Sequence, residues 1–136
     1  MDEYVVLDLE MTGLSAKTDQ IIEIGAVKIK ENQIIDTFSC LVNPKGKIPT
    51  RVVELTGITD EMVSNGMDKD EAVSQLLSFI EGYILVGQNI NFDYSFLKQW
   101  AVNHKQPLEA KACDTLKLAR VLLPAELPDL LKSYTL

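Results

Sequence analysis

The order of strand-like and helix-like patterns constrains the fold of this chain more than any other feature of its sequence. Three segments rich in apolar and β-branched residues come first, at 4–10, 21–29 and 34–42, and each is predicted to be a strand. The polar stretch at 30–33 is typical of a hairpin connection. Helical patterns separated by short strand-like runs follow, which predicts an α/β fold with a mixed sheet and helices packed on it.

The segment that follows the third strand is predicted to be a long loop. Proline and glycine recur at 43–58, where only a short helix at 51–55 is expected. Asp68 and Glu71 then resemble a capping box and open an amphipathic helix. The apolar residues of that helix are Val73, Leu76, Leu77 and Ile80.

A second helix and two short strands complete the predicted pattern. Residues 84–87 read as a buried strand, and Asn91 is expected to cap the helix that follows. The apolar face of that helix, expected in the core, comprises Phe92, Phe96, Leu97 and Trp100. A strand is predicted at 110–113, and Asp114 is expected to cap a helix that ends at Leu123.

Composition and charge limit the class of protein. The 136 residues, 46% hydrophobic and 24% charged, indicate one globular domain spanning 1–136. We expect no secretion signal and no membrane span, and Cys40 and Cys113 lack zinc-type spacing, so a reducing, cytoplasmic location is expected. The formal net charge of −7 argues against a protein that coats nucleic acid. It argues less against a nuclease, because bound divalent cations reverse the local sign.

Asp8 and Glu10 are the most informative pair of side chains. Residues two apart on a strand project from the same face, about 6–7 Å apart, so these two carboxylates repel each other. A hard cation such as Mg²⁺ or Mn²⁺ would neutralise them. The alternative is a solvated strand face, but the mostly apolar strand favours the metal site.

Three other features are weaker taken alone. Gly13 is expected to permit a tight turn with positive φ, which a plain strand-to-loop turn would also require. Asp93 lies in the first turn of its helix, where an acid is common because it suits the helix dipole. It also follows a strand end and a polar turn, where α/β folds place site residues. His104 is expected to be a solvated surface residue.

Taken together, the motifs resemble the DnaQ-like exonucleases of the DEDD superfamily. The run from Asp8 to Leu14 is similar to the first motif, D-x-E-x-T-G-L, and Asn89 with Phe92 and Asp93 matches the second. Shorter matches lie at 22–27, 43–44, 55–59 and 113–116, and the series is collinear over nearly the whole chain. Within this family, the chain most resembles the epsilon-type proofreading exonuclease of bacterial DNA polymerase III.

The resemblance implies a ribonuclease H-like fold and a two-metal site. Asp8, Glu10 and Asp93 would be catalytic metal ligands for Mg²⁺ or Mn²⁺. The residues implied in substrate binding are Thr12, Gly13, Leu14, Asn89 and Phe92. The implied reaction is 3′–5′ removal of nucleoside monophosphates from a single-stranded or frayed DNA 3′ end, with a DNA polymerase as a possible partner.

Two departures from the family pattern limit what is expected of this chain. Gln88 stands where many members have His, which removes no expected ligand. The family's third motif, a general-base His and a fourth Asp on a C-terminal helix, has no match, because His104 is too early and Asp129 precedes that region. We therefore expect a domain incomplete at its C-terminus, weakly active or inactive, whose open apolar face favours self-association.

Two other functions stay open at this point. The run from Asp8 to Leu14 also resembles oligoribonucleases, which would make RNA the substrate, although the element at 55–59 favours the proofreading type. A non-catalytic module that binds a polymerase is the second alternative. The missing third motif favours that module, and retention of the three acids counts against it.

Overall fold

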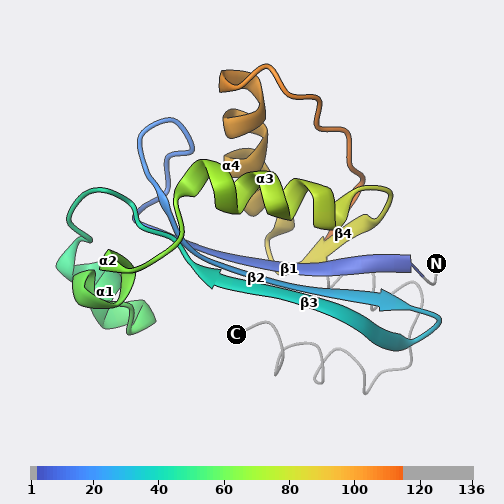
Figure 1. Ribbon diagram of the computed structural model, residues 1–136, viewed down its shortest axis with the longest axis horizontal. Helices are drawn as coiled ribbons and strands as arrows, with labels where there is room; N and C mark the ends of the chain where they lie inside the picture. Colours follow the sequence, from blue (N-terminus) through green and yellow to red (C-terminus); the bar gives the residue numbers. More distant parts are fainter. Residues whose placement is uncertain (1–2, 115–136) are drawn as a thin grey trace.

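The computed structural model describes residues 3–114, which form a five-stranded sheet with helices (Figure 1). The strands are β1 (Glu3–Met11), β2 (Ile21–Lys30), β3 (Gln33–Leu41), β4 (Ile84–Gly87) and β5 (Ala112–Asp114). Their order in the sheet is β3-β2-β1-β4-β5. The first three strands pair antiparallel, whereas β4 pairs parallel with β1 and with β5. The predicted mixed sheet is confirmed, and the first three strands differ from their predicted bounds by at most one residue.

The hairpin between β2 and β3 is also confirmed. Its central residues Glu31 and Asn32 have φ values of 52° and 64°. Two successive left-handed residues are the conformation of the two-residue turns whose twist matches that of paired strands. This geometry fixes the register in which Lys30 opposes Gln33.

Two long helices cover one face of the sheet. They are α3 (Lys69–Ile80) and α4 (Ile90–Asn103), and both lie over the same side of the strands (Figure 1). The alternation along β1 directs Val5, Leu7 and Leu9 into the core beneath them, where each is at most 4% exposed. The expected core residues Leu97 and Trp100 of α4 are buried there too.

The helix starts differ from the prediction in two details. Asp68 caps α3, because its carboxylate accepts hydrogen bonds from the amides of Asp70 and Glu71. The side chain of Glu71 does not complete a capping box, since it accepts a hydrogen bond from Gln75 instead. The prediction that Asn91 caps α4 is wrong: α4 begins at Ile90, one residue earlier, and its N-cap is Asn89.

Two short helices occupy the predicted loop region. They are α1 (Thr50–Thr56), which confirms the short predicted helix, and α2 (Asp60–Ser64). Both pack around Ile22 of β2 in a second, smaller cluster of buried residues. Gly57 ends α1 with φ of 76°, the left-handed conformation that favours glycine after a helix. Packing on Ile22 therefore fixes which face of α1 turns away from the sheet.

Some expectations fall on residues 115–136, which lie outside the described part of the chain. These are the helix from Asp114 to Leu123 and the domain incomplete at its C-terminus with an open apolar face. Within residues 3–114, no helix has the length and apolarity needed to cross a bilayer.

Candidate active site

The strand geometry of β1 presents two carboxylates on the face away from the α3–α4 core. Asp8 is exposed and Glu10 is half-buried, while Leu7 and Leu9 between and beside them are buried on the other face. Glu10 lies directly opposite Glu23 of β2, and Asp8 lies opposite Gly25. The sheet thus gathers Asp8, Glu10 and Glu23 on one surface.

The third carboxylate comes from α4. Asp93 is 5% exposed and is the one buried charged side chain among residues 3–114. Its Oδ2 accepts a hydrogen bond of 3.1 Å from the backbone N–H of Leu9, the residue between Asp8 and Glu10. That bond attaches the first turn of α4 to β1 and brings Asp93 close to Asp8 and Glu10, which lie 85 and 83 positions before it in the chain.

The electrostatics of these acids show mutual repulsion in a partly dry site. The pKa of Asp93 is raised to about 7, first by burial and then by the charges of Asp8 and Glu10, against the lowering effect of the Leu9 N–H. Burial also raises the pKa of Asp8 and Glu10, and Glu23 adds to both. Each carboxylate is therefore held in surroundings that disfavour its charge, which is the environment a bound cation relieves.

The three acids line one open cleft of about 630 Å³. Its walls come from β1, the connection after β1, α1, the 88–89 turn and the start of α4. The predicted site residues that line it are Asp8, Glu10, Gly13, Leu14, Asn89, Phe92 and Asp93. The structure thus brings together all of the predicted site residues except Thr12.

Thr12 is used within the connection after β1. Its hydroxyl donates to Asp19 at 3.2 Å and accepts from the Gln20 N–H at 2.9 Å. The other oxygen of Asp19 accepts from the Ser15 N–H at 2.9 Å. Asp19 therefore holds this connection closed, and Thr12 contributes to its shape and not to the cleft wall.

Gly13 has a different role from the one expected. Its φ is not positive, so the predicted left-handed turn is wrong. A Cβ at this position would lie 2.5 Å from Oδ2 of Asp19, closer than any real contact. The glycine is required because the carboxylate of Asp19 packs against its Cα. Leu14 follows with 81% of its surface exposed at the cleft.

The turn before α4 is held by backbone contacts. A Cβ on Gly87 would lie 2.6 Å from the carbonyl oxygen of Leu7, so β4 approaches β1 more closely than another residue would allow. Asn89 adopts a left-handed conformation, with φ of 55°, and its N–H donates to Oδ2 of Asp114 at 3.1 Å. Asp114 at the end of β5 therefore helps to fix the start of α4, and with it Asp93.

Sequence reasoning missed the contribution of α1 to the cleft. Arg51 and Leu55 lie one turn apart on α1 and both line the cleft. Leu55 is 84% exposed, whereas the nearby apolar residues Val52 and Ile58 are buried. The i, i+4 spacing placed them on one face, but no signal in the sequence indicated that this face turns toward the acids.

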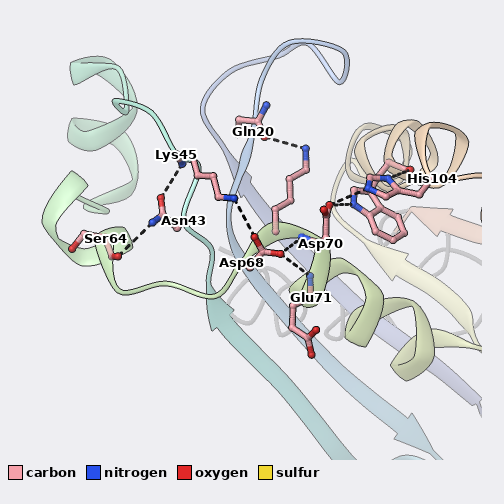
Figure 2. Close-up of polar contacts among 10 residues, drawn as sticks. Gln20, Asn43, Lys45, Ser64, Asp68, Asp70, Glu71 and His104 are labelled. Carbon is pink, nitrogen blue, oxygen red and sulfur yellow. Dashed lines mark hydrogen bonds and ion pairs between the residues drawn. The ribbon is translucent and has the colours of Figure 1, made fainter.

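His104 lies at the far end of α4 and does not line the cleft. Its ring stacks on Trp100 with centroids 4.1 Å apart, and its Nε2 lies 3.1 Å from Oδ1 of Asp70 (Figure 2). The indole N–H of Trp100 donates to the same oxygen at 2.8 Å. His104 is exposed as expected, but it belongs to a polar contact that connects α3 to α4.

The residues fit a hard divalent cation by the chemistry of their donors. Asp8, Glu10 and Asp93 offer carboxylate oxygens, which Mg²⁺ and Mn²⁺ prefer, in a site where their mutual repulsion is otherwise uncompensated. Among residues 3–114, no three acidic, His or Cys side chains yet lie close enough to form a complete ligand group. The three acids line one cleft and interact electrostatically, and a bound cation would have to draw their oxygens together.

The sheet order and the acidic cleft define a class of protein, the ribonuclease H-like domains with carboxylates on the central strand. The family comparison agrees, since residues 5–136 match the RNase T family of exonucleases. The chain belongs to this exonuclease family, as the DnaQ-like motifs indicated.

Two curated relatives confirm the expected link to bacterial DNA polymerase III. The PolC-type polymerase III of Clostridium perfringens is 45% identical over 123 residues, covering 90% of this chain and 8% of the polymerase. That of Thermotoga petrophila is 44% identical over 135 residues, covering 98% and 9%. The chain therefore spans less than a tenth of the length of these relatives.

Solved structures confirm the predicted ribonuclease H-like fold. E. coli exonuclease I in complex with a dA16 oligonucleotide superposes with a TM-score of 0.75 at 16% identity, covering 88% of this chain and 29% of the exonuclease. Its zinc-bound form gives a TM-score of 0.76. At this identity the likeness concerns the fold alone.

Proposed function

We propose that this domain hydrolyses the last phosphodiester at the 3′ end of a DNA strand, as a 3′–5′ exonuclease of the proofreading type. The observation that carries the proposal is the meeting of Asp8, Glu10 and Asp93 in one cleft, held by the hydrogen bond from the Leu9 N–H to Asp93. Membership of the exonuclease family and the polymerase III relatives support the same reaction.

Asp8, Glu10 and Asp93 would hold Mg²⁺ or Mn²⁺. Two such ions, when bound, lower the pKa of water and neutralise charge on the attacking and leaving oxygens. In the reaction, the water oxygen forms a bond to phosphorus while the bond from phosphorus to the 3′ oxygen breaks. The 3′ oxygen takes up a proton, and a nucleoside 5′-monophosphate leaves. Among residues 3–114, no histidine lines the cleft.

The apolar parts of the cleft would hold the terminal nucleotide. Leu14 and Leu55 line the cleft from two different segments with most of their surface exposed, and Phe92 of α4 adds an aromatic ring to the lining. Nucleobases present apolar faces that stack on such side chains regardless of sequence. These three residues, with backbone contacts from Gly13 and Asn89, would orient the terminal nucleotide so that its phosphodiester reaches the carboxylates.

The test is hydrolysis of a single-stranded DNA oligonucleotide in Mn²⁺, followed by separation of the products. We expect slow release of nucleoside 5′-monophosphates from the 3′ end, because the chain has no match to the family's third motif, and we expect Asp8→Asn and Asp93→Asn to abolish that release. Glu109→Gln removes an exposed acid away from the cleft and is the matched control. Calorimetry with Mn²⁺ on the same variants checks the ligands independently of turnover.

The outcomes separate the alternatives. Faster hydrolysis of an RNA oligonucleotide of the same sequence would replace DNA by RNA as the substrate, as in oligoribonucleases. Mn²⁺ binding that does not depend on Asp8, together with no hydrolysis of either polymer, would refute the nuclease and leave the polymerase-binding module.

A further inference from the structure

The part of the cleft wall that α1 forms contains a cation that the metal chemistry does not use. Arg51 is the only positively charged residue among the described residues that line the cleft. Its side chain is exposed, and within residues 3–114 its guanidinium forms no hydrogen bond or ion pair. It therefore does not neutralise Asp8, Glu10 or Asp93 directly, although it shares their cleft.

The position of Arg51 in α1 is not explained by the stability of the helix. It lies in the first turn, where the helix dipole is positive and a cation is unfavourable, and no acidic residue occupies that turn. A neutral or acidic residue would suit this place better. With no partner among residues 3–114, the arginine can bind an anion that enters the cleft from solvent.

The face of α1 that carries Arg51 has the pattern of a nucleotide-binding surface. Leu55 lies one turn further along the same face, 84% exposed, so the face presents a planar cation followed by an apolar group. A polynucleotide presents phosphates and bases at alternating positions. Arginine binds phosphate through paired N–H groups, and apolar side chains support a base.

We infer that Arg51 is a substrate-binding residue that contacts a backbone phosphate on the 5′ side of the bond that is cleaved. The inference rests on the proposed function. The last phosphodiester must reach the acids on β1 and α4, so a group on α1 would contact a different phosphate. A strand that ends in a 3′ hydroxyl has no phosphate beyond its last nucleotide, so every other phosphate lies on the 5′ side.

Substrates with one and with several phosphates test this directly. The p-nitrophenyl ester of thymidine 5′-monophosphate has a single phosphodiester, whereas hexathymidylate offers further phosphates upstream. For Arg51→Gln we expect the KM for the hexamer to rise about 5- to 20-fold, with the KM for the single ester unchanged. Lys47→Gln, which removes an exposed cation just before α1 and outside the cleft, should change neither.

A binding measurement keeps the test independent of turnover. Fluorescence anisotropy with 5′-labelled hexathymidylate in Ca²⁺ gives the Kd at several salt concentrations. Losing one phosphate contact in Arg51→Gln should raise the Kd for the hexamer about 5- to 20-fold, as expected for its KM. It should also reduce the slope of the logarithm of the binding constant against the logarithm of salt concentration by about 0.7. Arg51→Lys should retain most of the slope, because it keeps the charge. Circular dichroism checks that each variant is folded.

Three outcomes would overturn the inference: an unchanged Kd for the hexamer in Arg51→Gln, an equal rise in KM for both substrates, or an equal effect of Lys47→Gln. The second would place Arg51 at the scissile phosphate. If neither substrate is hydrolysed and no Mn²⁺ binds, the proposed function fails, and the anisotropy of the hexamer still decides whether Arg51 binds phosphate.

Discussion

Replacing Asp93 by Asn tests whether this carboxylate lowers the stability of the metal-free domain. The pKa of Asp93 is raised from 3.8 to about 7 by burial and by its acidic neighbours. The folded state therefore holds this proton more tightly than the unfolded state does. The stability that protonated Asp93 contributes is fully present below pH 3.8 and is lost as the pH rises through about 7.

The size of the effect follows from the displacement of the pKa. A rise from 3.8 to about 7 corresponds to about 4 kcal/mol of unfolding free energy. Water in the open cleft screens part of this, so we expect a loss of about 2–4 kcal/mol between about pH 4 and pH 8. Asp93→Asn should not show that loss, because the amide stays neutral and its oxygen can still accept the Leu9 N–H.

Urea unfolding across this pH range, without divalent cations, gives the two stability curves. The difference between them matters more than either curve, since Asp8 and Glu10 titrate in both proteins. In Mn²⁺ at about 100 times its Kd, the wild type should gain about 2.7 kcal/mol at the higher pH, and Asp93→Asn far less. Parallel curves for the two proteins, or an equal gain from Mn²⁺, would refute the reasoning.

Three further predictions concern contacts around the cleft and the core. Gly13→Ala should destabilise the domain by about 1–3 kcal/mol in urea, because its Cβ would meet Asp19 at 2.5 Å, whereas Gly46→Ala, with its nearest atom at 4.0 Å, should cost far less; equal costs would contradict the packing argument. Asp19→Ala should raise the KM for a DNA oligonucleotide, because it releases the connection that carries Leu14, and should leave the calorimetric Mn²⁺ affinity unchanged. Weaker Mn²⁺ binding would show that Asp19 supports the metal ligands and not only this connection. Asp70→Ala should cost about 1–3 kcal/mol of unfolding free energy, because the buried Trp100 indole N–H loses its acceptor; Glu71→Ala, in the same helical turn, is the control, and an equal loss in both would assign the effect to the helix start.

Much of the fold could be predicted because local pattern and tertiary burial agree along β1, β2, α3 and α4. The alternation in β1 indicated both the buried Leu7 and Leu9 and the opposite face that carries Asp8 and Glu10. Spacing alone could not place Asp93 beside them, and the family motif supplied that expectation. The contact depends on where β4 lies in the sheet, which is a long-range property.

The parts that could not be predicted depend on contacts between segments. Arg51 and Leu55 were missed because packing of α1 on Ile22 decides which helix face meets the cleft. Thr12 was expected near the substrate, but its hydroxyl is taken by Asp19 and Gln20. The sequence correctly indicated that position 13 requires glycine, but the predicted reason was wrong. The requirement comes from the close approach of Asp19 and not from a positive φ, and either condition favours glycine.

The sheet topology explains why the acids meet where they do. β4 pairs with β1 only as far as Val6 opposite Val86, and the chain then turns at Gly87 into α4. Leu9, further along β1, therefore has no β4 residue beside it, and its N–H is free to bond elsewhere. The carboxylate of Asp93 accepts a hydrogen bond from this N–H at 3.1 Å. Beyond the end of β4, a side chain of α4 therefore replaces a strand as the partner of β1. Asp93 is therefore buried on α4 beside Asp8 and Glu10 of β1, where burial and the charges of these neighbours disfavour its ionised form. A cation compensates these charges, so the end of β1–β4 pairing would be both a structural junction and the place where metal binding stabilises the fold.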